Sequence, residues 1–222
     1  MFTPKAHIII IDGQEGSGRN TFAFELALTL LYNAQRTALV LTPDSPLRET
    51  VKKRKILMSE QLTPSIINRD DFYKEANKYQ AVIIPRTDTT DNYAVAASTY
   101  ITLLSTSKNN VQKFSKNIHY LNNIFELKKK IASTYGHSLN WIVCENNLKT
   151  TAIDSPSEEL EKISRQHGFR LAPPLNRRIS YQNNINGISA QDKSLPFLKK
   201  ELTYEDICAK REIVKLAEFI FR

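Results

Sequence analysis

A glycine-rich segment near the amino end has the residue types and the spacing of a site that binds phosphate groups. Gly13 and Gly18 stand where the outer glycines stand in the phosphate-loop pattern G-x-x-x-x-G-K-[ST]. Glycines let backbone N–H groups approach phosphate oxygens closely, and a helix N-terminus adds partial positive charge. The residues expected to line a nucleotide site are therefore Gly13, Gln14, Glu15, Gly16, Ser17, Gly18, Arg19, Asn20 and Thr21.

The two side chains of this pattern that carry its chemistry are changed. Arg19 replaces the lysine and keeps the positive charge, but on a larger, planar group. Asn20 replaces the hydroxyl residue that ordinarily ligates Mg²⁺, and its amide oxygen makes it only a weak candidate ligand. Thr21 offers a hydroxyl one position later. The sequence predicts the architecture of a phosphate site with altered chemistry.

The elements around the loop predict a layered fold. The run of isoleucines at residues 8–11 indicates a strand buried on both faces, and an apolar helix follows the loop. Further strands are expected at 37–41, 81–84, 100–104 and 141–144, and helices at 46–58, 70–78, 111–135, 156–166 and 204–221. This alternation predicts an α/β fold with a doubly wound, mostly parallel sheet and helices on both faces. We expect one domain over residues 1–222, with the basic run at 52–55 on a solvated helix face.

Composition narrows the class of protein. The chain has 222 residues and a formal net charge of +8, which favours nucleic acid or another anionic partner. Its two cysteines, Cys144 and Cys208, make neither a disulfide framework nor a metal site. No apolar run reaches membrane-spanning length and no signal-peptide pattern is visible, so a cytoplasmic protein is expected.

Together these residues resemble the ParA/MinD superfamily of deviant Walker-A ATPases, and most closely the MipZ family, which positions the division plane. The likeness extends over nearly the whole chain. It lies in the loop, in residues 30–32 (LLY), in 140–143 (NWIV) with Asn146, in 167–170 (HGFR), in 174–175 (PL) with Arg178 and Tyr181, and in 209–212 (AKRE).

The resemblance assigns roles to single positions, and most of the catalytic ones are altered. Gln14 stands where the family has a signature lysine that reaches the partner subunit's nucleotide, and Glu15 replaces a glycine. Pro85 stands where the family has a Walker-B aspartate, and Asp88 is a candidate to replace that aspartate from a shifted position. Two family residues are retained. They are Asp44, which orients the attacking water, and Asn146, which contacts the adenine.

The resemblance implies ATP and Mg²⁺ as cofactors and a spatial regulator of cell division or chromosome partition. Its partners would be non-specific DNA, contacted by Arg177 and Arg178, and a ParB-like or division protein. Because phosphoryl transfer depends on the lysine and the metal, the changes predict weak or lost hydrolysis. The alternative is a divergent but active ATPase that dimerises with Mg-ATP. The chain would be a monomer or a homodimer.

Overall fold

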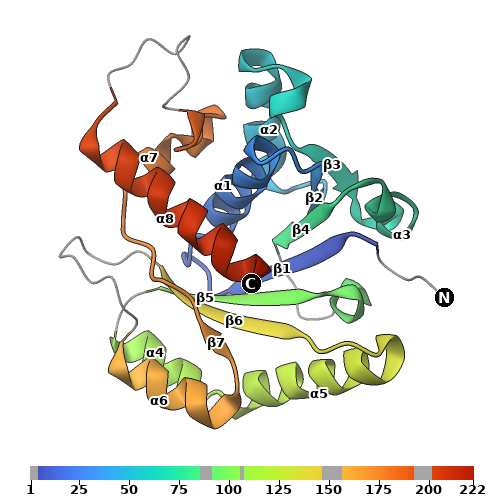
Figure 1. Cartoon of the computed structure of the whole chain (residues 1–222), viewed down its shortest axis with the longest axis vertical. Helices are drawn as coiled ribbons and strands as arrows, with labels where there is room; N and C mark the ends of the chain where they lie inside the picture. The colour runs from blue at the N-terminus through green and yellow to red at the C-terminus, as the bar shows by residue number, and fades with distance from the viewer. Residues whose placement is uncertain (1–4, 86–91, 106–107, 147–156, 193–201) are drawn as a thin grey trace.

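One seven-stranded sheet forms the centre of the molecule in a computed structural model that describes residues 5–85, 92–105, 108–146, 157–192 and 202–222. The strands are β1 (His7–Gly13), β2 (Thr37–Leu41), β3 (Ser65–Asn68), β4 (Ala81–Pro85), β5 (Thr99–Ser105), β6 (Asn140–Asn146) and β7 (Arg170–Leu171). Their order is β3-β2-β4-β1-β5-β6-β7, and each of these pairings is parallel (Figure 1). The predicted parallel α/β sheet is confirmed.

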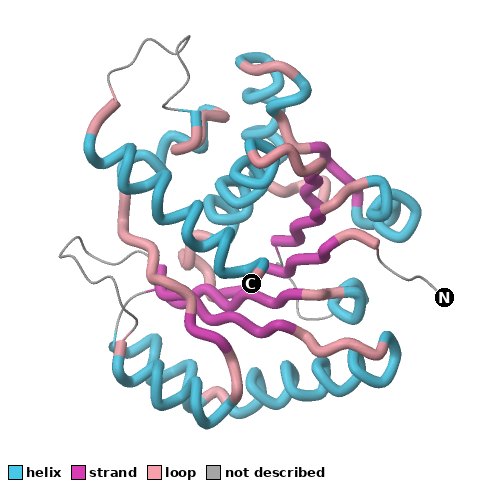
Figure 2. The backbone as a smooth tube through the Cα atoms, viewed as in Figure 1, coloured by secondary structure: helices cyan, strands magenta, loops and turns pink. Residues whose placement is uncertain are grey.

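Helices cover both faces of the sheet (Figure 2). One layer holds α1 (Arg19–Tyr32), α2 (Pro46–Leu57), α7 (Ile179–Gln182) and α8 (Tyr204–Phe221). The other holds α3 (Phe72–Glu75), α4 (Lys108–Lys116), α5 (Ile118–Tyr135) and α6 (Glu158–His167). Short 3₁₀ segments lie at Glu60–Leu62, Arg69–Asp71, Ala76–Lys78, Asn92–Ala96 and Asn183–Asn186. The single domain over residues 1–222 stays a prediction.

The isoleucine run explains the central place of β1. Ile8 and Ile10 face the core under α4 and α5, whereas Ile9 and Ile11 face the core under α1 and α8. All four side chains are buried. Because side chains alternate along a strand, a strand that is apolar on both faces belongs between two helical layers. The segment that follows β1 therefore lies at the carboxyl edge near the middle of the sheet.

Some elements differ from the sequence prediction. The helix expected at 111–135 is two helices, because Asn117 ends the first and caps the second, its Oδ1 accepting from the backbone N–H of Tyr120 at 3.1 Å. The helix expected at 156–166 begins at Glu158, and residue 156 lies outside the described residues. Strands β3 and β7 are short edge strands, which leave too little period-2 signal to be found in the sequence.

The expectation of a solvated basic run at residues 52–55 is wrong for Arg54, whose side chain is fully buried. Its guanidinium forms a bidentate pair with Asp192, with Nη1–Oδ2 at 2.5 Å and Nη2–Oδ1 at 2.9 Å. It also donates to the carbonyls of Leu62 and Gly187. A buried charge needs a paired and fully hydrogen-bonded site, and Asp192 provides it from far along the chain. The Arg54–Asp192 pair joins α2 to the segment around Asp192, which precedes α8 in the chain.

Candidate functional site

The loop between β1 and α1 is a tight turn at the carboxyl edge of the sheet. The backbone N–H of Ser17 donates to the carbonyl of Gln14 at 3.0 Å, and Gly16 lies in the left-handed region with φ 76°. Gly18 has φ 85°, and its carbonyl accepts the first helical hydrogen bond of α1 from Phe22. The loop thus has the predicted place, between a central strand and a helix N-terminus, where open α/β sheets bind ligands.

The outer glycines are required by close packing within the chain. A Cβ on Gly13 would lie 2.6 Å from the carbonyl oxygen of Leu103 on β5. A Cβ on Gly18 would lie 2.5 Å from Nδ2 of Asn146, at the end of β6. The same Nδ2 donates to the carbonyl of Ser17 at 2.6 Å. Asn146, which the family resemblance assigns to the adenine, here holds the loop backbone against the sheet.

The charges of the loop differ from end to end. Gln14, Glu15 and Gly16 are exposed, so the outer part of the turn presents a carboxylate. Arg19, Asn20 and Thr21 begin α1 and are half-buried. Glycine turns, the helix N-terminus and the Arg19 guanidinium fit a phosphate group. The negative charge of Glu15 would repel a phosphate group placed at the exposed part of the turn.

The position expected to bind metal lies beside the loop and lacks a ligand. In the pairing of β1 with β4, Pro85 stands opposite Ile11, two residues before Gly13. Pro85 is buried and carries no side-chain oxygen. Asp88 lies outside the described residues. Asn20 offers only an amide, so the described residues at these two positions do not fit a Mg²⁺ site, which ordinarily uses a carboxylate.

Asp44 lies at the same edge of the sheet, after β2, and β4 separates β2 from β1. Its carboxylate is exposed. Its pKa is lowered, first by a hydrogen bond from the Thr42 side chain, then by its own backbone N–H and by the charge of Arg69. Asp44 is therefore an ionised carboxylate at neutral pH. Over the described ranges, no group of three or more acidic, histidine or cysteine side chains is placed to hold a metal ion.

Sequence reasoning missed a half-buried carboxylate, Asp12, whose hydrogen bonds lie under the loop. Asp12 Oδ2 accepts from the hydroxyls of Tyr100 at 2.5 Å and Tyr120 at 3.1 Å, and Oδ1 accepts from the N–H of Gly13 at 2.8 Å. Burial, followed by the charges of Tyr100 and Asp12, raises the pKa of Tyr120 well above its usual value, so it stays a donor. The network orients the first peptide of the loop. The only sign of this network in the sequence was a polar residue, Asp12, at the end of the apolar strand β1.

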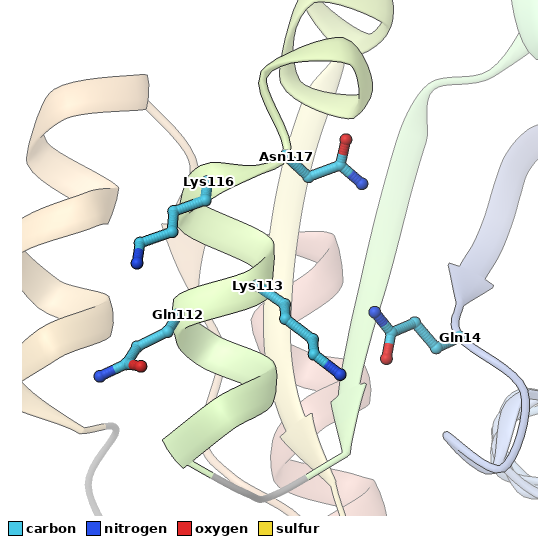
Figure 3. Close-up of a pocket in the computed structure, with 5 residues that line it drawn as sticks. All are labelled: Gln14, Gln112, Lys113, Lys116 and Asn117. Carbon is cyan, nitrogen blue, oxygen red and sulfur yellow. The ribbon is translucent and has the colours of Figure 1, made fainter.

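A cavity of about 530 Å³ adjoins the loop on the side of α4. Its described lining residues are Gln14, Gln112, Lys113, Lys116 and Asn117. Lys113 and Gln14 point toward one another across it, whereas Gln112 and Lys116 extend to the other side of α4 (Figure 3). No local pattern in the sequence indicated that α4 would lie beside the loop.

The two arginines expected to bind DNA have different surroundings. Arg177 is exposed. Arg178 is half-buried and its Nη2 lies 2.5 Å from Oε1 of Glu212 on α8. The same carboxylate accepts from the side-chain amide of Asn176 at 2.8 Å. Arg178 therefore joins the segment before α7 to α8, and Arg177 is the one of the two that solvent reaches freely.

The sequence profile of the family described as ATPase MipZ matches residues 98–220, more than half of the chain. The chain belongs to the MipZ family. The matched region of this MipZ-family chain runs from the start of β5 almost to the end of α8. It excludes the loop, Asp44 and Pro85, so membership rests on residues other than the altered catalytic ones. A search of curated proteins finds no match to the chain.

Solved structures share the fold of this MipZ-family chain at low sequence identity. Apo McdA of Cyanothece is 15% identical, with a TM-score of 0.61 over 94% of this chain and 99% of that one. MinD of Aquifex aeolicus in its complex with MinC is 13% identical, with a TM-score of 0.59 over 97% of this chain and 96% of that one. MinD of Pyrococcus horikoshii with Mg-ADP is 13% identical, with a TM-score of 0.62 over 97% of this chain and 96% of that one. These likenesses confirm the fold.

The helices that the structure describes include none that is both long enough and apolar enough to cross a lipid bilayer.

Proposed function

We propose that this MipZ-family chain is a spatial regulator of cell division or chromosome partition in which ATP hydrolysis is weak or lost. The observation that carries this proposal is the pairing of Pro85 with Ile11. It puts a side chain without oxygen at the point next to the loop where a metal-binding carboxylate belongs. Asn20, on the other side of the loop, supplies no hydroxyl or carboxylate.

The physical reason is electrostatic. Phosphoryl transfer needs charge stabilisation of the transferring group by lysine and metal, and removal of one preorganised group typically costs about 3 kcal/mol of barrier. The metal side of this site lacks its ligands at both Asn20 and Pro85, and Gln14 carries no charge toward a partner subunit. We therefore derive no catalytic step through Mg²⁺ in this chain.

Binding of a nucleotide is a separate proposal from hydrolysis. The loop N–H groups, the N-terminus of α1 and Arg19 fit the phosphates, so we propose that a nucleotide is held without family-like turnover. The structure of MinD with Mg-ADP, which has the same fold, supports the binding of a nucleotide. The proposed partners are a ParB-like or division protein, for which the complex of MinC with MinD is a parallel, and non-specific DNA contacted by Arg177. The net charge of +8 favours DNA as a partner.

Phosphate release tests the proposal. Purified protein is incubated with Mg-ATP, with and without duplex DNA, beside an Asp44→Ala variant. We expect release equal to background in every sample, because Asn20 and Pro85 stand at the two metal-ligand positions that the structure describes. DNA-stimulated release that disappears in Asp44→Ala would establish the alternative, a divergent active ATPase.

Light scattering at several protein concentrations tests the switch that the alternative requires. Because Gln14 is neutral and Glu15 is negative, we expect the same mass with and without Mg-ATP, whether monomer or dimer. A mass that doubles only when Mg-ATP is added would contradict the proposal.

A further inference from the structure

The cavity between the loop and α4 has the charge of an anion site. Its described lining residues are two lysines, Lys113 and Lys116, and three residues with neutral amides, Gln14, Gln112 and Asn117. Of the two lysines, only Lys113 extends toward Gln14 (Figure 3). No carboxylate belongs to that lining. Within the described residues, neither lysine forms an ion pair. Concave sites lined by one sign of charge concentrate ions of the other sign.

The arrangement of the side chains selects one of the lysines. Lys113 extends from α4 toward Gln14, whose amide reaches back from the loop, so a cation and an amide face the same space (Figure 3). Lys116 lines the cavity but extends away from Gln14. An anion that touches both the loop and α4 would therefore meet Lys113 first. Gln14 would add an N–H donor from the opposite wall.

The neighbouring carboxylates do not cancel this charge. Asp12 lies beneath the loop, but its oxygens already accept from Tyr100, Tyr120 and the backbone of Gly13. Glu15 follows Gln14 on the exposed part of the turn and does not belong to the described lining. The turn itself contributes no cation on this side, because Gln14 is neutral. Among the described residues that line the cavity, the positive charge comes from α4.

We propose that the phosphate chain of a nucleotide held on the loop extends into this cavity, where Lys113 of α4 supplies a positive charge opposite Gln14. The proposal rests on the proposed function, since it takes the loop as the place where the nucleotide sits. It goes beyond that function by naming a binding residue far from the loop in sequence. The shared chemistry is a di- or triphosphate, free or attached to a nucleoside.

Isothermal titration with three probes tests the site. ATP, inorganic tripolyphosphate and a short DNA duplex are each titrated into the wild type and into Lys113→Ala, Lys113→Arg, Lys116→Ala and Lys130→Ala. Lys130 is an exposed lysine on α5 and serves as a control for net charge. The side-chain amide signals of Gln14 are followed by NMR in parallel.

We expect Lys113→Ala to weaken ATP and tripolyphosphate about tenfold, the usual effect of losing one charge-assisted contact. Lys113→Arg should restore most of the affinity, Lys116→Ala should have a smaller effect and Lys130→Ala none. The Gln14 amide signals should shift when either probe binds. Binding of ATP but not of tripolyphosphate would show that the nucleoside is also needed, and the proposal would hold if Lys113→Ala still weakened it.

Several results would overturn the inference. They are absence of ATP and tripolyphosphate binding by the wild type, an unchanged affinity in Lys113→Ala, or an effect of Lys113→Ala on duplex DNA alone. An unchanged affinity would leave the proposed function intact, because hydrolysis is measured separately. Conversely, Mg-ATP turnover would contradict the proposed function without touching the role of Lys113.

Discussion

The side-chain amide of Asn146 donates to the backbone carbonyl of Ser17 at 2.6 Å, joining the end of β6 to the loop after β1. The two residues are 129 positions apart in the chain, and both are buried. The contact leaves no space for a side chain on Gly18, whose Cβ would lie 2.5 Å from the same nitrogen. The shape of the loop is therefore held by the protein itself, before any ligand binds.

This contact predicts unequal effects of alanine at two glycines of the loop. Gly16 and Gly18 both have positive φ, which costs an ordinary residue about 1–2 kcal/mol. A Cβ on Gly16 meets nothing within 4 Å, whereas one on Gly18 collides with the bonded amide of Asn146. Urea unfolding should show Gly18→Ala to be more destabilising than Gly16→Ala. In an Asn146→Ala background the difference should vanish, and equal costs in the wild-type background would contradict the packing described.

The buried carboxyl of Glu25 on α1 predicts a pH dependence of stability. Its oxygens accept from Ser189 at 2.7 Å and from the N–H of Ala190 at 3.0 Å. Burial raises its pKa from 4.5 to about 7, with a further increase from the charge of Asp192. The folded state then binds more protons than the unfolded state between these values, so Glu25 lowers the free energy of unfolding as pH rises from about 4.5 to 7.

Glu25→Gln should remove this dependence. Each pKa unit is worth 1.36 kcal/mol, so the variant should gain about 3 kcal/mol relative to wild type between pH 4.5 and pH 7.5. Urea unfolding of both proteins at several pH values measures the difference. Parallel stability curves for the two proteins would show that Glu25 has an ordinary pKa.

The ion pair of Arg54 with Asp192 predicts a large loss of stability when one partner is removed. Arg54→Met leaves the buried carboxylate without its counter-ion, and such changes typically cost about 3–5 kcal/mol. The neighbouring Lys55→Met is the matched control, because Lys55 pairs with Glu60 in solvent, where an ion pair adds little to the free energy of unfolding. The double variant Arg54→Met/Asp192→Leu should recover stability relative to Arg54→Met. Similar costs for the two single variants would contradict the burial of the pair.

The surroundings of Arg177 and Arg178 predict two different kinds of effect. Arg177→Ala should weaken binding to duplex DNA and reduce the slope of log K against log salt by about 1, without changing stability. Arg178→Ala should instead lower the free energy of unfolding by about 1–3 kcal/mol, because Glu212 loses its charged donor. DNA titrations at several salt concentrations, together with urea unfolding, separate the two. A salt slope unchanged in Arg177→Ala would remove that residue from the DNA surface.

The sequence alone determined the elements whose signal is local. Strand β2 and helix α8 have the predicted bounds, and the isoleucines of β1 correctly placed it between two helical layers. Periodicity and burial on both faces are properties of neighbouring residues, so a single sequence carries them. The same holds for the strand, glycine turn and helix of the loop. The replacements Asn20 and Pro85 were also visible as residue types.

Only the tertiary structure decided which distant side chains meet. The contacts of Asn146 with Ser17, of Arg54 with Asp192 and of Arg178 with Glu212 join segments from 34 to 138 positions apart. Parallel strands require crossover helices, and the path of each crossover determines which polar groups share an edge or a buried site. Lys113 faces Gln14 because β5 lies beside β1 and α4 follows it, which no pattern near either residue records.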